Sequence, residues 1–293
     1  MAKSPKQSAA LLSIGSNSVL ILFKVVVGSL SGSVSIISEA IHSANDLLAA
    51  LVAWWSVRVA DRPPDEDHPY GHGKIESISG AFEAGLIIFA AVWIIYEAFK
   101  RLVNPSGVDH LWLGILVMLT SAALNVVVSR RLYAVAEKED SLALEADAAH
   151  LAADIYTSVG VAIGLLLVWI TGWHWIDPIA AIAVALFIVK IGWNLIRGSA
   201  SHLMDASLPE ADLHQIKAIL DEERRILNWH DLRTRKAGSY RHIDVHISIA
   251  ETMTFVDAHT IADDLEQELE RKLSPAHVVI HIDPAGPDGK PIR

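Results

Sequence analysis

Long apolar stretches dominate the first two thirds of the chain, and turn-forming residues separate them. A helix that crosses a bilayer needs roughly twenty mainly apolar residues, and six stretches have that length. Breakers lie between them at residues 28–32, at Pro63 and Pro64, and at Thr171 and Gly172. A soluble six-helix core would show a polar face along each helix, which the fourth and sixth stretches almost lack. The pattern predicts membrane-spanning helices over residues 9–30, 34–59, 78–102, 111–133, 142–170 and 176–196.

The chain changes character near residues 200–208, where apolar stretches give way to charged, alternating sequence. Helical spacing over residues 209–220 and 256–273 is combined with strand patterns over residues 231–236, 242–249 and 278–283. From His242 to Ile249 aliphatic side chains alternate strictly with polar ones, as in a sheet with one covered face. We therefore expect an all-α six-helix transmembrane domain over residues 1–204 and a small α+β domain of αββαβ order over residues 205–293.

Basic residues near the predicted spans indicate the orientation of the chain. Nine Lys and Arg side chains fall on the side of the two termini, and only Lys100 and Arg101 fall on the other side. Because cytoplasmic segments carry an excess of Lys and Arg, we expect both termini, and the tail that follows the sixth span, to be cytosolic.

The amino-acid composition limits the environment, the partners and the metal ligands that the chain can have. With 52% hydrophobic residues and a mean hydropathy of +0.35, the chain suits a lipid bilayer. A net charge of −10 argues against a nucleic-acid partner, because phosphate binding needs a basic surface. The chain has no cysteine, so any metal ion must be held by imidazole and carboxylate groups, which suits zinc and harder divalent ions.

Two predicted spans repeat one pattern of ionisable residues. His42 and Asp46 lie four residues apart in the second span, and His150 and Asp154 lie four residues apart in the fifth. Four residues is just over one helical turn, so each pair projects from one face. Two imidazoles and two carboxylates fit tetrahedral Zn²⁺. The alternative is that each histidine merely bonds the aspartate one turn along its own helix.

Other charges in the spans carry less information. An ionisable group in the bilayer costs roughly 3 kcal/mol or more unless it faces a partner or a cavity. Lys24, Glu83 and Lys190 have no ligand-like neighbour at matching spacing. We interpret them as internal partners of other polar groups or as side chains that reach the membrane surface.

These residues and four further segments make the chain similar to the cation diffusion facilitator family of metal/proton antiporters, nearly from end to end. The segments are Ser31-Gly-Ser-Val-Ser35, His68-Pro-Tyr-Gly-His-Gly-Lys-Ile-Glu76, Asp231-Leu-Arg-Thr-Arg235 and Ile280-His-Ile-Asp-Pro284. The resemblance implies a homodimer in the cell (inner) membrane with a cytosolic metallochaperone-like domain. It also implies that His42, Asp46, His150 and Asp154 form the transport site.

The same resemblance implies two more metal sites and a charge pair. One site lies in the loop after the second span, at Asp65, His68 and His72, although alone these residues also fit a solvated acidic loop. The second site is cytosolic and comprises His230, His246, His259, His281 and Asp283. Strand alternation supports part of it independently, since His281 and Asp283 share a face, whereas Ile282 stands where relatives often have a polar residue. The charge pair is Lys74 and Asp205.

The sequence thus predicts a non-enzymatic transporter that exports divalent metal, foremost Zn²⁺, from the cytosol in exchange for protons. Antiport of another or a broader set of metals (Cd²⁺, Fe²⁺, Co²⁺ or Mn²⁺) is the nearest alternative. An intramembrane zinc metalloenzyme is a further one, but its usual His-Glu-x-x-His motif is absent from the sequence. A metal sensor anchored in the membrane would not need six spans with buried ligands. Zn²⁺ is also expected as a structural or regulatory ligand of the cytosolic domain.

Overall fold

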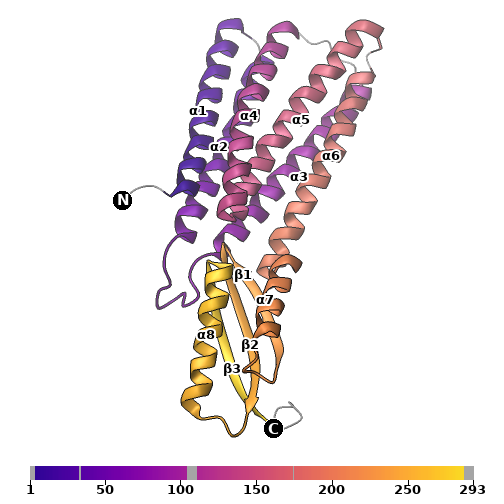
Figure 1. Ribbon diagram of the computed structural model, residues 1–293. Helices are drawn as coiled ribbons and strands as arrows, with labels where there is room; N and C mark the ends of the chain where they lie inside the picture. The colour runs from indigo at the N-terminus through magenta and orange to yellow at the C-terminus, as the bar shows by residue number, and fades with distance from the viewer. Residues whose placement is uncertain (1–3, 33, 104–110, 174, 287–293) are drawn as a thin grey trace. The chain divides into compact units, whose positions relative to one another are not determined.

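The computed structural model describes residues 4–32, 34–103, 111–173 and 175–286 (Figure 1). Ser33, in the first of the family segments, lies outside the described residues. The chain divides into two compact units, Met1–Ala200 and Ser201–Arg293. Each unit has its own core and its own candidate metal ligands.

Long helices make up the first unit, at the places that the apolar pattern predicts. Each extends beyond its apolar stretch at one end or both, because the flanking polar residues continue the helix. Five of them, α1, α3, α4, α5 and α6, are long and apolar enough to cross a membrane by length and composition. The remaining helix, α2, is long enough but less apolar, because it carries Glu39, His42 and Asp46. Their bounds are α1 Pro5–Ser31, α2 Val34–Ala60, α3 Lys74–Val103, α4 Leu111–Glu139, α5 Leu142–Thr171 and α6 Ile176–Leu203.

Helix α5 is fixed at both ends by its own sequence. The Ser141 hydroxyl accepts a hydrogen bond from the Leu144 backbone N–H at its start. At its end Gly172 adopts φ 72°, a left-handed conformation that glycine reaches without steric cost, and its N–H donates to the Val168 carbonyl. These caps fix where the helix begins and ends, and within it the spacing of four residues puts His150 and Asp154 on one face.

Small residues let α5 approach its neighbours closely. Apolar contacts join it to α1, α2 and α4 on one side and to α3 and α6 on another, mostly through buried alanines such as Ala143, Ala148 and Ala149. At Gly160 a methyl group would lie 2.5 Å from Cγ2 of Val184 in α6, closer than real atoms approach. Without a hydrophobic driving force inside lipid, such close packing of small residues is what holds membrane helices together.

A buried ion pair joins the starts of three helices. The Lys6 ammonium of α1 donates to Oε1 of Glu76 in α3 over 3.1 Å. The other oxygen, Oε2, accepts from the Ser141 hydroxyl at 2.5 Å and from the Ala143 N–H at 3.5 Å, at the beginning of α5. Because Lys6 and Glu76 are both buried, these contacts satisfy charges that would otherwise oppose folding.

The second unit is the predicted αββαβ domain (Figure 1). A three-stranded sheet has the order β1-β2-β3, with β1 antiparallel and β3 parallel to β2. The parallel pair is connected through α8, as a crossover requires. The elements are α7 Glu210–Glu222, β1 Asn228–Ala237, β2 Tyr240–Ala250, α8 Phe255–Leu273 and β3 Ala276–Ala285.

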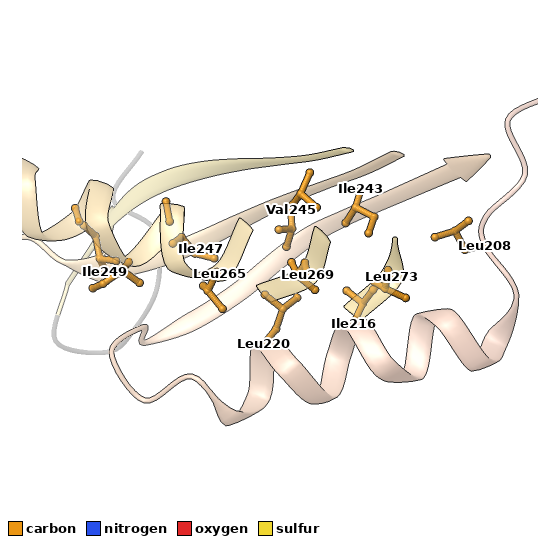
Figure 2. Packing of buried hydrophobic residues seen from close by; sticks show 14 residues of the cluster. Leu208, Ile216, Leu220, Ile243, Val245, Ile247, Ile249, Leu265, Leu269 and Leu273 are labelled. Atoms are coloured by element: carbon orange, nitrogen blue, oxygen red, sulfur yellow. The ribbon is translucent and has the colours of Figure 1, made fainter. Parts of the chain in front are cut away.

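Helices cover one face of this sheet. Ile243, Val245 and Ile247 alternate along β2 and contact Ile216 of α7 and Leu269 of α8 in one apolar core (Figure 2). The side chains between them in β2, from His242 to Ser248, point to the opposite face. That face is the one on which the candidate ligands of the tail lie.

We expect Lys6→Met to destabilise the protein, because it leaves the Glu76 carboxylate buried without a cation. Removing one partner of a buried pair costs about 3–5 kcal/mol. The measurement is the midpoint of thermal unfolding in detergent. Lys100→Met is the matched control, since Lys100 pairs with Glu97 at 3.6 Å on the exposed end of α3 and such a pair contributes below about 1 kcal/mol. Equal midpoints for the two variants would contradict the assignment.

Candidate metal centres

The two His-x-x-x-Asp pairs form crossed contacts between α2 and α5. Nε2 of His150 in α5 lies 3.2 Å from Oδ1 of Asp46 in α2. Nε2 of His42 in α2 lies 3.9 Å from Oδ1 of Asp154 in α5. Each histidine therefore faces the aspartate of the other helix, and the intrahelical pairing considered from the sequence is not the arrangement found.

Three of these four residues border a small cavity inside the helical unit. His42, His150 and Asp154 line it together with Ile87 of α3 and Ile188 of α6, and about 20 Å³ of it is open to the centre of a water molecule. That is room for roughly one water molecule or one ion. One ligand atom each from His42, Asp46 and Asp154 lies within 4.8 Å of the other two. The fourth predicted ligand, His150, reaches this group through its contact with Asp46.

Burial makes these polar atoms unusual. Asp46 and His150 are only 5% and 6% exposed. Nδ1 of His150 and Oδ2 of Asp154 are buried and have no hydrogen-bond partner among the described residues. A buried polar atom without a partner costs about 1–3 kcal/mol, so the site is incompletely satisfied without a further ligand.

Helix α1 supports the site with two residues to which the sequence assigned no ligand role. The Asn17 amide donates to the Asp46 backbone carbonyl over 3.4 Å. The Lys24 ammonium donates to the Ser43 hydroxyl at 2.8 Å and lies 3.4 Å from Oε2 of Glu39, so Lys24 is an internal partner. Sequence reasoning passed over Asn17, whose amide in an apolar stretch was the available signal.

The loop between α2 and α3 brings Asp65, His68 and His72 together. Oδ1 of Asp65 accepts from the His68 N–H at 2.7 Å and lies 3.1 Å from its Nδ1, while Oδ2 lies 3.2 Å from Nε2 of His72. Slight desolvation opposes ionisation of Asp65, but the hydrogen bonds from His68 and the charges of both imidazoles hold its pKa below the usual range. The three candidate ligand atoms lie within 4.8 Å of one another.

In the tail, strand register places three histidines in one row across the sheet. His230 of β1 is opposite His246 of β2, and His246 is beside His281 of β3. The register shifts just after His230, where Asp231 has φ 50°; such a bulge re-aims side chains. The row lies on the sheet face that α7 and α8 leave uncovered.

Asp283 is the common partner of this row. Its Oδ2 lies 2.9 Å from Nδ1 of His246 and 3.3 Å from Nε2 of His230, and its Oδ1 lies 3.4 Å from Nε2 of His281. Partial burial acts to raise the pKa of Asp283, but the His246 hydrogen bond and the nearby imidazoles hold that pKa below its usual range. His230, His246 and Asp283 form a group able to hold a metal ion.

One predicted ligand of the tail lies elsewhere, and the strand residue between two other predicted ligands faces the apolar core. His259 is on α8, where its Nδ1 is 3.5 Å from Oδ1 of Asp263, and the structure does not bring it into the row. Ile282 packs against the apolar core, so its side chain points away from the row. The pair of Lys74 and Asp205 would join the two units and stays a prediction; within the second unit Asp205 lies 3.5 Å from the Arg235 guanidinium.

Comparison with known proteins agrees with this organisation. Residues 10–204 match the family model of the cation efflux transmembrane domain, and residues 208–285 match that of the cation efflux protein, cytoplasmic domain. A solved structure, the metal-bound C-terminal domain of the CzcD transporter from Thermotoga maritima, covers 27% of this chain and 96% of its own, with 25% identity and a TM-score of 0.25. Family membership rests on the sequence matches.

Two curated relatives align along nearly the whole chain. An uncharacterized transporter of Synechocystis, sll1263, is 36% identical over 276 residues, which are 94% of this chain and 89% of the relative. The cation-efflux pump FieF of Shewanella oneidensis is 32% identical over 279 residues, 94% of this chain and 93% of the relative. The apolar helices and the match to the transmembrane domain make the chain an integral membrane protein that exports divalent metal cations. Together with the match of its second domain and of these relatives, they show that it belongs to the cation diffusion facilitator family.

Proposed function

We propose that this protein exports Zn²⁺ from the cytosol in exchange for protons, with His42, Asp46, His150 and Asp154 as the transport site. The crossed contacts between α2 and α5 carry the proposal. They gather two imidazoles and two carboxylates, the donor set that suits zinc when no thiolate is present. Each helix contributes both kinds of ligand, so a change in how α2 and α5 meet alters the whole site.

The contact between His150 and Asp46 supports exchange with protons. The distance of 3.2 Å between Nε2 and Oδ1 suits a hydrogen bond in which Nε2 carries a proton and Oδ1 accepts it. A cation that binds through both atoms must displace that proton, and a returning proton competes with the cation. Alternation between a cytosol-facing and an outward-facing state then needs different affinities in the two states.

The tail and loop groups extend the proposal. We assign Asp65, His68 and His72 to a loop metal site, and His230, His246, His281 and Asp283 to a cytosolic one, with His259 as a ligand only if α8 or its side chain moves. A homodimer in the inner membrane with both termini cytosolic fits the match of residues 208–285 and the distribution of Lys and Arg. Metal flux in sealed vesicles separates this transporter from a metalloenzyme or a sensor, neither of which moves metal across a bilayer.

We expect Asp154→Ala to abolish zinc flux in reconstituted vesicles, because it removes a ligand that faces His42 and lines the cavity. The variant should stay folded and elute from size exclusion like the unmodified protein. Glu145→Ala, which removes an exposed carboxylate from the first turn of the same helix, is the control and should transport normally. Zinc flux at the unmodified rate in purified Asp154→Ala would sink the site assignment.

We expect Asp283→Asn to lower the number of zinc ions bound per chain at equilibrium, since one carboxylate serves three histidines. Its depressed pKa keeps Asp283 ionised at neutral pH, so the substitution removes a full charge, and affinity at the tail should fall at least about tenfold. Asp244→Asn, an exposed residue of β2, is the control. Calorimetry that gives both variants the same stoichiometry and affinity would rule out the cluster.

We expect His42→Asp to keep zinc transport and to gain cadmium transport. An imidazole offers one directional nitrogen at about 2.0 Å and favours compact tetrahedral zinc. A carboxylate binds through one or two oxygens and tolerates larger ions. The measurement is the ratio of initial cadmium and zinc fluxes for both proteins under one proton gradient. An unchanged ratio would show that helix packing, not the residue at position 42, sets selectivity.

A further inference from the structure

Two acidic side chains of the helical unit lie outside every candidate metal group and wholly inside the protein. Glu83 of α3 is 0% exposed and Asp147 of α5 is 1% exposed. Among the described residues neither forms an ion pair with a lysine, arginine or histidine. By contrast, Glu76 lies in the same helix and is equally buried, but the Lys6 ammonium is its partner. Glu83 and Asp147 therefore need another way to avoid a buried charge.

Hydroxyl groups are the hydrogen-bond partners of these acids. The Ser79 hydroxyl donates to Oε1 of Glu83 over 3.3 Å, and the Ser13 hydroxyl of α1 donates to Oδ1 of Asp147 over 3.2 Å. The second oxygens, Oε2 of Glu83 and Oδ2 of Asp147, are buried without a partner among the described residues. An ionised carboxylate there would cost several kcal/mol, and a proton on the orphaned oxygen removes that cost.

Helical spacing sets both acids near the candidate transport site. Glu83 precedes Ile87, which lines the cavity with His42 and His150, by four residues and so shares its face of α3. Asp147 also precedes His150 by three residues, about 4.5 Å of helix rise. A divalent cation arriving at His150 and Asp46 therefore favours loss of a proton from the neighbouring acids, and its departure favours return of the proton.

We propose that Glu83 and Asp147 form an intramembrane proton-binding site, separate from the metal ligands, that takes up and releases a proton as metal leaves and enters the transport site. This inference rests on the proposed exchange of metal for protons and extends it beyond the displaced proton of His150 and Asp46. In the step only an O–H bond of a carboxyl group breaks or forms, and the proton passes to or from water. The hydroxyls of Ser79 and Ser13, which both donate and accept, hold the two acids in place.

The test compares Glu83→Gln with the unmodified protein in vesicles that report zinc and proton movement together. Glutamine imitates the protonated acid, so its carbonyl still accepts from Ser79 and the variant should fold. We expect zinc still to bind, but with an affinity by calorimetry that depends less steeply on pH because the coupled proton is gone, together with fewer protons moved per zinc ion and a weaker response of zinc flux to an imposed pH gradient. Glu97→Gln, on the same helix but at its exposed end, should match the unmodified protein in all three measurements. An unchanged ratio of protons to zinc in Glu83→Gln would overturn the inference while leaving the antiport intact.

Infrared difference spectra between the metal-free and zinc-loaded protein separate this inference from the proposed function. The carbonyl stretch of a neutral carboxylic acid should disappear on zinc loading in the unmodified protein and should be absent from that difference in Glu83→Gln. If the unmodified protein moves zinc without protons, the proposed antiport fails, and the spectra alone decide whether Glu83 releases a proton. A spectrum with no neutral-acid band in the unmodified protein would overturn the site. Asp147→Asn, whose amide can accept from Ser13, provides a second variant with the same expected changes.

Discussion

Ionisable side chains inside a membrane must be satisfied by one another, because neither lipid nor water is available to solvate them. The helical unit meets this requirement in three ways. His150 contacts Asp46 and His42 faces Asp154 across helices, Lys6 neutralises Glu76, and Glu83 with Asp147 is left to hold protons. Each solution requires a particular neighbour, so the positions of the charges must agree with the way the helices pack.

Close packing around α5 makes these pairings possible. Crossed contacts of 3.2 and 3.9 Å demand that the backbones of α2 and α5 approach closely, and the alanines of α5 permit it. The same helix begins at the Glu76 network, so one helix connects the buried ion pair of Lys6 and Glu76 with the candidate ligands His150 and Asp154. Larger residues at these alanine positions would push α2 and α5 apart and so separate the candidate ligands, although every ligand would still be present.

The sequence predicts the helices, the order of helices and strands in the tail, and the candidate ligands. It does not predict which side chains of different helices contact one another. Spacing of four residues puts His150 and Asp154 on one face, yet the partner of His150 depends on how α2 packs. For the same reason Glu83 could be described only as an internal partner or a surface-reaching group, while its burial without a cation is a property of the packed bundle. In the tail, strand alternation placed His246 and His281 correctly, whereas His259, on a helix, depended wholly on resemblance and lies beside Asp263.

The ratio of acids to imidazoles distinguishes the metal groups. In the helical unit each of two histidines has its own aspartate, so the site remains locally paired when no metal is bound. In the tail three histidines surround Asp283, and the rings of His230, His246 and His281 follow one another at 5.3 and 4.5 Å between centroids. Imidazoles so crowded repel one another once protonated, and one carboxylate balances only one of their positive charges. The two pairs of the helical unit lie on separate helices and can part when α2 and α5 move, whereas strand register fixes the tail ligands of β1, β2 and β3 in one sheet. This contrast favours transport in the membrane and a structural or regulatory metal in the tail.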